Sequence, residues 1–301
     1  MEDDHMKATA KFLALALSLS VATNGYACTE DGREGIVEEN NMYISADAKN
    51  VGGVTEEQFN AVIDKVEAIY APVIQQQGAT LQVVRNWTDG TVNAYASRSG
   101  NTWTVQMFGG LARHETITED GLALVVCHEI GHHIGGAPKK AGGGWWGGGA
   151  SWASNEGQSD YFANLKCLRR AFLNDNNTEV LARMEIPVAV RTACGAAWAD
   201  KADSDICIRG AMAGMSVAKL FQALRNATVL PDFTTPDAAV VSRTNDAHPA
   251  YQCRLDTYFQ GSLCGVDEAV EVSNTDEKAG TCHQSTMTAG VRPVCWFKPT
   301  L

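Results

Sequence analysis

Two histidines four residues apart, His128 and His132, enclose Glu129 and Gly131. On an α-helix, residues four apart lie one turn apart on the same face, so both imidazoles can bind one metal ion. Glu129 lies about a third of a turn away, and its carboxylate can reach a water molecule on that ion without binding the ion itself. The spacing predicts a catalytic site for one zinc ion per chain, with Glu129 as general base. A polar surface patch is the alternative, and the apolar residues 124–126 argue against it.

A catalytic zinc ion usually takes three protein ligands, so a third ligand is expected downstream. Glu156 and Asp160 are four residues apart in a predicted helix, and both can face the histidine pair. One carboxylate can bind zinc while the other accepts a hydrogen bond from a ligand histidine and fixes its tautomer. Their spacing alone does not assign the two roles.

Hydrophobic periodicity and capping signals predict an α+β chain that is mostly helical with a small sheet. The glycine- and tryptophan-rich segment 139–152 lies between the two metal-binding segments, and it is either a flexible loop or a mobile flap over the site. No linker divides the chain, so we expect a single domain over residues 28–301 with a cysteine-rich C-terminal portion. Helices are expected over residues 55–70, 118–134, 155–172, 211–226 and 249–260, and strands over 80–87, 92–96 and 102–107, the last two as a hairpin.

The net charge limits the partners. The formal charge is −11, and no Lys/Arg-rich run interrupts it. Such a charge argues against nucleic acid and against an anionic membrane surface as partners. With 45% hydrophobic and 20% charged residues, the 301-residue chain has the composition of a globular protein with a substantial core.

The N-terminus predicts export. Residues 1–27 resemble a secretory signal peptide, with lysines near the start, an apolar stretch over residues 12–21, and Gly25-Tyr26-Ala27 as a small-x-small cleavage site. No later stretch reaches the roughly 18 apolar residues of a transmembrane helix, so no transmembrane segment is expected in the mature chain. We expect a periplasmic or secreted protein of bacterial export. Lipidation of Cys28, the first mature residue, would instead tether it to the outer membrane.

The cysteines agree with export. There are nine, and none lies in a C-x-x-C pair, which favours disulfides over a cysteine metal site. Setting Cys28 aside leaves eight, which can pair evenly. We expect near neighbours to pair: Cys127 with Cys167, Cys194 with Cys207, Cys253 with Cys264, and Cys282 with Cys295.

Taken in order, the motifs resemble one family of zinc peptidases. The H-E-x-x-H at residues 128–132 followed by Glu156-x-x-Ser159-Asp160 is similar to the H-E-x-x-H and E-x-x-A-D segments of the family that includes the CAAX prenyl endopeptidases, the HtpX-type heat-shock peptidases and the periplasmic BepA-type peptidases. Residues 93–96 (Asn-Ala-Tyr-Ala) resemble its N-A-x-A strand. His248-Pro249, with Arg254 six residues after the histidine, resembles its H-P-P-x-x-x-R segment. The likeness covers residues 93–163 and 246–256, about a quarter of the chain.

The resemblance implies a zincin-like metallopeptidase fold of the gluzincin type, with the H-E-x-x-H segment on the active-site helix. In this chain, disulfides are expected to cross-link that fold. It implies that His128, His132 and Glu156 bind zinc. It implies that Glu129 is both general base and general acid, and that Asp160 orients a ligand.

The resemblance also implies that His248 lies near the metal, where it either donates to the oxyanion or blocks the site, with Arg254 supporting it. The chain is therefore expected to be an exported zinc-dependent endopeptidase that cleaves unfolded or extended polypeptides. Residues 103–107 are expected to form an edge strand that binds substrate by strand addition. The alternative is a latent or non-catalytic exported zinc-binding or chaperone-like module whose site is plugged, for example by His248.

Overall fold

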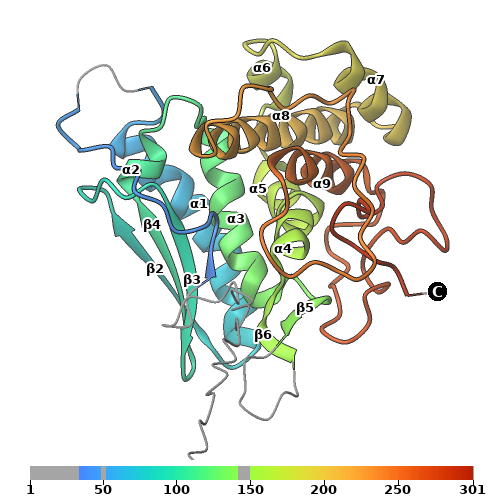
Figure 1. Cartoon of the computed structure of the whole chain (residues 1–301), viewed down its shortest axis with the longest axis horizontal. Helices are drawn as coiled ribbons and strands as arrows, with labels where there is room; N and C mark the ends of the chain where they lie inside the picture. Colours follow the sequence, from blue (N-terminus) through green and yellow to red (C-terminus); the bar gives the residue numbers. More distant parts are fainter. Residues whose placement is uncertain (1–33, 49–51, 142–149, 301) are drawn as a thin grey trace, which may run out of the picture.

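The computed structural model describes residues 34–48, 52–141 and 150–300 (Figure 1). The predicted signal peptide, Cys28 and the middle of the glycine-rich segment lie outside these ranges. Helix predominates over strand, as predicted, and the fold is mixed α/β, with a small sheet on one side and most of the helices on the other. Within the described ranges, no helix combines the length and the apolar character that crossing a membrane requires.

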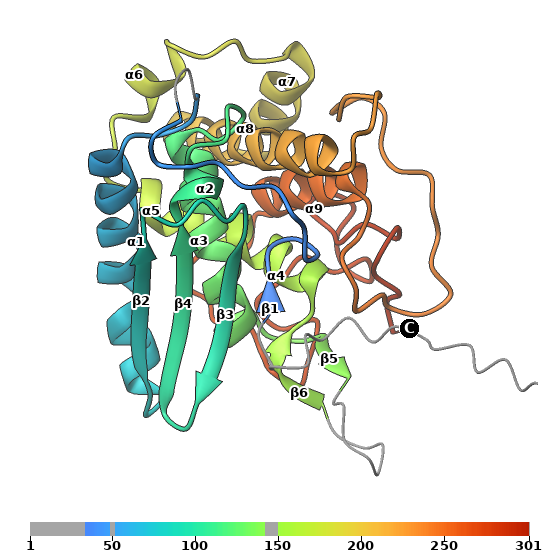
Figure 2. The ribbon, with the colours of Figure 1, turned by 60° about the vertical axis from the view of Figure 1, so that its left-hand side comes forward.

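The main sheet corrects one prediction. The predicted hairpin is present, because β3 and β4 pair in antiparallel. The other side of β4 pairs in parallel with β2, so residues 103–107 lie inside the sheet and the prediction of an edge strand there is wrong. The outer positions belong to β1 and β2 (Figure 2). The four strands, in sheet order, are β1 (Glu34–Gly35), β3 (Ala94–Ser99), β4 (Thr102–Phe108) and β2 (Thr80–Asn86).

The helix with the H-E-x-x-H segment, α3 (Glu119–Ile134), runs through the centre of the molecule (Figure 1). It begins where predicted, because the side chain of Thr118 accepts a hydrogen bond from the Gly121 amide. Every α3 residue after the first is buried. The sheet covers one side of the helix, and other helices cover the rest, which is why residues 121–127 are apolar on all faces. These helices are α1 (Glu56–Gln76), α4 (Glu156–Phe162) and α8 (Lys201–Leu224).

The second predicted metal-binding helix is continuous but changes pitch. After α4 the chain passes into a π-helical segment, η1 (Ala163–Leu168), and then into α5 (Arg169–Phe172). The side chain of Asn164 in η1 donates to the Tyr258 carbonyl of α9 (Tyr251–Leu263) over 2.8 Å. The strands β5 (Lys139–Ala141) and β6 (Ala150–Ser154) pair in antiparallel and lead into α4.

The helices of the C-terminal half differ in part from those predicted. α8 begins at Lys201 rather than near residue 211, because the side chain of Asp200 caps it through the Ala202 amide. α6 (Asn177–Leu181) and α7 (Val188–Ala197) have no counterpart among the predicted helices.

The described residues contain four disulfides, and two of the four predicted pairs are confirmed: Cys127–Cys167 and Cys194–Cys207. The other two predictions are wrong. Cys253 lies in the first turn of α9 and Cys264 just past its end, so the helix holds them roughly 16 Å apart, too far for a disulfide. The observed partners are Cys253 with Cys295 and Cys264 with Cys282.

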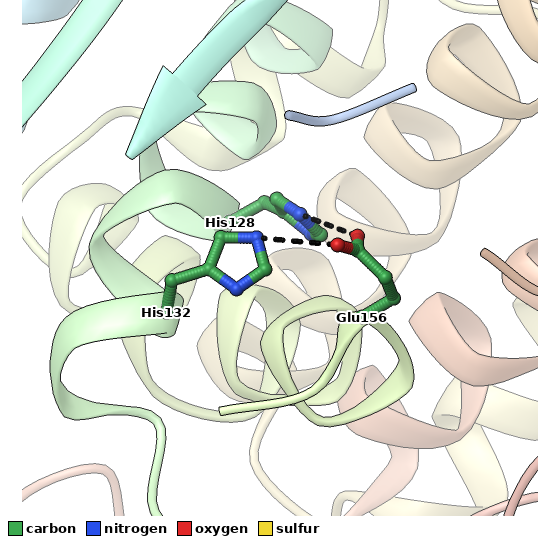
Figure 3. Close-up of side chains that lie close together, drawn as sticks. All are labelled: His128, His132 and Glu156. Carbon is green, nitrogen blue, oxygen red and sulfur yellow. Dashed lines mark ion pairs between the residues drawn. The ribbon is translucent and has the colours of Figure 1, made fainter. Parts of the chain in front are cut away.

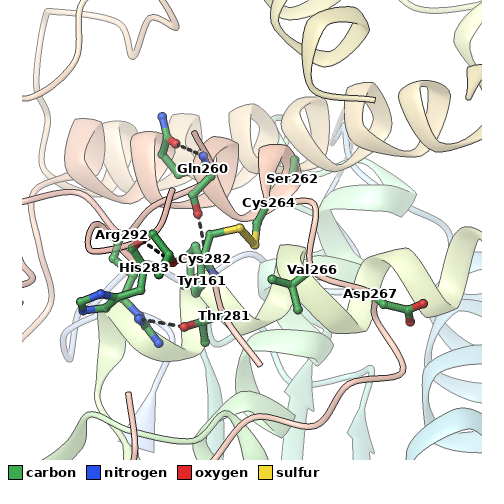
Figure 4. The surroundings of a disulfide bond; sticks show 12 residues. Tyr161, Gln260, Ser262, Cys264, Val266, Asp267, Thr281, Cys282, His283 and Arg292 are labelled. Atoms are coloured by element: carbon green, nitrogen blue, oxygen red, sulfur yellow. Dashed lines mark hydrogen bonds between the residues drawn. A yellow bond between two sulfur atoms is a disulfide. The ribbon is translucent and has the colours of Figure 1, made fainter. Parts of the chain in front are cut away.

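These two disulfides fasten the C-terminal tail, residues 265–300, to α9 and to the cysteine that follows it; Figure 4 shows the bond between Cys264 and Cys282. The hydroxyl of Tyr161 donates to the Gly290 carbonyl over 2.5 Å. Arg292 donates to the side chain of Gln158 over 2.7 Å, and Gln158 donates to the Gly135 carbonyl at the end of α3 over 2.6 Å. The tail therefore fixes α4 and α3 relative to each other.

A substitution at Gly157 tests how tightly the tail packs against α4. A Cβ atom at Gly157 would lie 2.2 Å from a ring carbon of the fully buried Trp296. We predict that Gly157→Ala lowers the free energy of unfolding by about 1–3 kcal/mol, because the ring has no room to move. Gly195 is the matched control, since it lies in α7 with open space around it. Gly195→Ala should raise that free energy by about 0.5–1 kcal/mol. Urea unfolding of both variants measures this, and equal effects would contradict the packing described.

Candidate metal centre

Three side chains from two helices converge at the centre of the molecule (Figure 3). His128 and His132 come from α3 and Glu156 from the first turn of α4, and all three are fully buried. Nε2 of His128 lies 3.3 Å from Oε2 of Glu156, and Nε2 of His132 lies 3.7 Å from Oε1. Neighbouring ligand atoms around a tetrahedral zinc ion are about 3.3 Å apart, so the three side chains fit such an ion.

The second nitrogen of each ring shows which atom faces the cluster. Nδ1 of His132 lies 2.9 Å from the carbonyl oxygen of Ser154, which can only accept, so Nδ1 carries the proton. Nδ1 of His128 donates to Asp160 over 2.7 Å. Within the described ranges, neither Nε2 atom has a hydrogen-bond partner, and the same holds for Oε2 of Glu156. Buried polar atoms without a hydrogen-bond partner are rare in proteins. A metal ion bound by these three atoms would provide the missing partner.

Asp160 is held on all sides. Its carboxylate accepts from Nε and from a terminal nitrogen of Arg254, each over 2.7 Å, and from the hydroxyl of Tyr258 over 2.6 Å. Burial opposes its ionisation, but Arg254 and His128 outweigh burial and lower the pKa of Asp160. Asp160 thus stays charged and orients His128. The guanidinium of Arg254, which the resemblance places in support of His248, donates to this carboxylate and to the Ile36 carbonyl.

Two further histidines lie close by, His133 buried and His248 partly buried, and their bonding differs. Nε2 of His133 donates to the Thr104 carbonyl, and its Nδ1 accepts from Arg98. Burial and the charge of Arg98 lower the pKa of His133 to about 3, so the ring is neutral. Nε2 of His248 donates to the carbonyl oxygen of Gly35 over 2.8 Å and lies 3.3 Å from Oε2 of Glu156. The structure therefore places Nε2 of His248 at the cluster, as a hydrogen-bond donor.

Lys140 on β5 is a site residue that the sequence analysis missed. Its ammonium group lies 3.0 Å from Oε1 of Glu156, and the side chain is almost fully buried. The β5–β6 pairing brings Lys140 to the start of α4, and that pairing has no clear signal in the sequence. Burial opposes the charge on Glu156, but His248 and Lys140 outweigh it and hold the pKa of Glu156 well below its usual range.

The two ligand histidines have opposite electrostatics. Burial alone would lower the pKa of His128, but Asp160 and Glu156 outweigh it and raise this pKa to about 9. Burial lowers the pKa of His132 well below its usual value. Without a metal, therefore, His128 carries a proton that Glu156 and Asp160 stabilise. Metal binding must release this proton, because a metal ligand has to be deprotonated.

Close helix packing sets the distances between the ligands. A Cβ atom at Gly131 would lie 3.1 Å from the backbone of Ser159, so glycine lets α3 and α4 approach closely. The disulfide between Cys127, next to His128, and Cys167 on η1 joins the same two helical runs. Glu129, directly after His128 on α3, is fully buried as well.

A second group of potential ligands does not have the same chemistry. Asp237, Cys253 and Cys295 lie close enough to share an ion. Cys253 and Cys295 are joined in a disulfide, so neither offers the thiolate that binds a metal. Among the described residues, the cluster on α3 and α4 is the better candidate.

Comparison of the chain with protein-family models, with curated proteins and with solved structures finds no match. The assignment of chemistry to this site therefore depends on its own geometry.

The hydrogen bonds of the four histidines predict which variants of the chain keep a zinc ion. We expect one zinc ion per wild-type chain, and loss of that ion when any of the three ligands is replaced by glutamine. His133→Gln and His248→Gln should keep the ion, because both rings use Nε2 as a donor. Elemental analysis after dialysis against a weak chelator measures this. Loss of zinc from His133→Gln, or its retention in all variants, would contradict the assignment.

Asp160 gives a second prediction. Asp160→Asn should weaken zinc affinity by about 10–100-fold, because the residue that orients His128 loses its charge. Tyr258→Phe removes one bond to Asp160 and keeps the charge, so its effect should be smaller. Competition with a fluorescent chelator measures the affinities, and circular dichroism checks folding. Equal affinities in Asp160→Asn and wild type would show that Asp160 does not tune the site.

Proposed function

We propose that the chain is an exported zinc-dependent endopeptidase, zincin-like in fold, that hydrolyses unfolded or extended polypeptides. The observation that carries the proposal is the convergence of His128, His132 and Glu156 with Nε2 and carboxylate atoms turned toward one point. Glu129 lies on the same buried helix, one residue from a ligand. Four disulfides support export, because they persist in oxidising compartments.

A zinc ion held by these ligands supplies Lewis acidity, which polarises a peptide carbonyl and activates a water molecule. The remaining steps belong to side chains of the chain. Glu129 takes a proton from the attacking water and delivers it to the leaving amine. Asp160 keeps His128 in the tautomer that presents Nε2. Nε2–H of His248 already binds a peptide carbonyl, that of Gly35, and can donate in the same way to the oxygen of a substrate carbonyl as negative charge develops.

One observation favours a second candidate, a latent form of the same site. Lys140 and His248 both lie against Glu156, and His248 also binds the carbonyl of Gly35 in the N-terminal part of the chain. The chain's own groups thus surround the position where a substrate would bind. A latent peptidase keeps Glu129 but needs these groups to move, whereas a purely zinc-binding or chaperone-like module has no use for a base at that position.

Hydrolysis of reduced casein tests the proposal. Zinc-loaded Glu129→Gln should cleave about 10²–10⁴-fold more slowly than the wild type, because the amide cannot accept a proton. Glu115→Gln is the control, since Glu115 is exposed and precedes α3. Both variants should hold one zinc ion.

Equal cleavage by wild type and Glu129→Gln would remove the support for Glu129 as the base. If no form cleaves although zinc is bound, the active-peptidase proposal fails and latency becomes the leading account.

A further inference from the structure

The N-terminal residues 34–37, called here the resident segment, add a short strand to the sheet beside the metal centre (Figure 2). Glu34 lies opposite Ala96 and Gly35 opposite Tyr95 in antiparallel register. The Ile36 amide donates to the Ala94 carbonyl over 3.1 Å. This part of β3 therefore recognises an extended backbone through main-chain bonds, which do not depend on side-chain identity.

Side chains bind the carbonyl groups of the same backbone. Nε2 of His248 donates to the Gly35 carbonyl over 2.8 Å. The guanidinium of Arg254, which also holds Asp160, donates to the Ile36 carbonyl. The Val37 carbonyl accepts from the side chain of Asn93 over 3.2 Å. Three successive peptide carbonyls are thus bound by side chains, one of which lies 3.3 Å from the predicted zinc ligand Glu156.

We propose that the edge of β3 at residues 94–96, with His248 and Arg254, is the site that binds the backbone of an extended polypeptide substrate, and that the resident segment occupies it. This inference rests on the proposed peptidase function. It identifies the group that makes the site latent: a piece of the chain bound as a substrate would be, antiparallel to β3 with a carbonyl on His248. An external polypeptide must displace this segment to reach the zinc ligands.

The resident segment also indicates which polypeptides fit. A Cβ atom at Gly35 would lie 3.1 Å from the ring of Tyr95, so a small residue is favoured where the carbonyl meets His248. Ile36 is fully buried in the main core, so the next residue is expected to be a branched aliphatic one. Beyond it lies a cavity of about 120 Å³, lined in part by Val37, Phe221 and His248, which offers room for further side chains. The preferred substrate is an extended segment with a small residue followed by an aliphatic one.

Peptide binding to the full-length, zinc-loaded Glu129→Gln protein tests the inference without hydrolysis. The probe is a fluorescent peptide with the sequence of residues 34–39, Glu-Gly-Ile-Val-Glu-Glu. Adding Ile36→Asp places a carboxylate at a fully buried position. Burying an unpaired charge is unfavourable, so this substitution should release the resident segment. We expect the probe to bind this variant at least about tenfold more tightly than the parent. In the parent, the probe must first displace the resident segment.

Glu38→Gln in the same background is the matched control, because Glu38 is exposed and directly follows the resident segment. It should bind the probe as weakly as the parent does. A probe with aspartate in place of its isoleucine should bind neither protein. Equal affinity of the original probe for the parent and the Ile36→Asp variant would overturn the inference, and so would absence of binding to both.

A second measurement serves if Ile36→Asp does not fold. Amide exchange, followed by NMR on the folded Glu129→Gln protein with saturating probe, should show faster exchange at Ile36 while residues 94–96 stay protected. Retained protection at Ile36 with the probe bound would overturn the inference. If the probe displaces the segment but the Glu129-containing protein cleaves no polypeptide, the binding site stands and the peptidase proposal falls.

Discussion

The buried carboxylate of Asp160 is the group on which the arrangement of the site depends. Removing such an ion from water costs several kcal/mol, so it is tolerated only when its hydrogen bonds are complete. Asp160, on α4, obtains these bonds from His128 on α3 and from Arg254 and Tyr258 on α9. A shift of α3 or α9 relative to α4 would break at least one of the bonds to this buried charge. The same interaction that stabilises the fold therefore fixes the direction of a predicted zinc ligand.

The positively charged groups around Glu156 balance the charge of this buried carboxylate. A fully buried carboxylate needs positive charge nearby, and Lys140, together with the proton on His128, supplies it in the arrangement described. A divalent cation in the same place would supply that charge instead and would displace the proton. The cluster is thus consistent with two states, one compensated by the chain itself and one by a metal ion.

The sequence allowed the local features to be predicted and left the long-range ones open. Helical spacing placed His128 and His132 together, and it placed Glu156 and Asp160 on one helix, because these relations depend only on helix geometry. Which carboxylate orients a histidine depends on Arg254, about 94 residues away along the chain, and became visible only in the structure. The disulfides of α9 were mispredicted because nearness in sequence was taken as nearness in space, although a helix holds Cys253 and Cys264 apart.

The mispredicted edge strand has a physical reason of the same kind. An alternating run such as residues 102–108 predicts a strand but not its neighbours, and here β2 pairs with it in parallel from the other side. The strand beside the candidate metal centre is β3, and its outer pairing is made by a segment from far earlier in the chain. Pairing across such a sequence distance carries no local signal, because it depends on main-chain bonds that any residue except proline can make. The pairing of β1 with β3 is thus a feature that single-sequence reasoning could not reach.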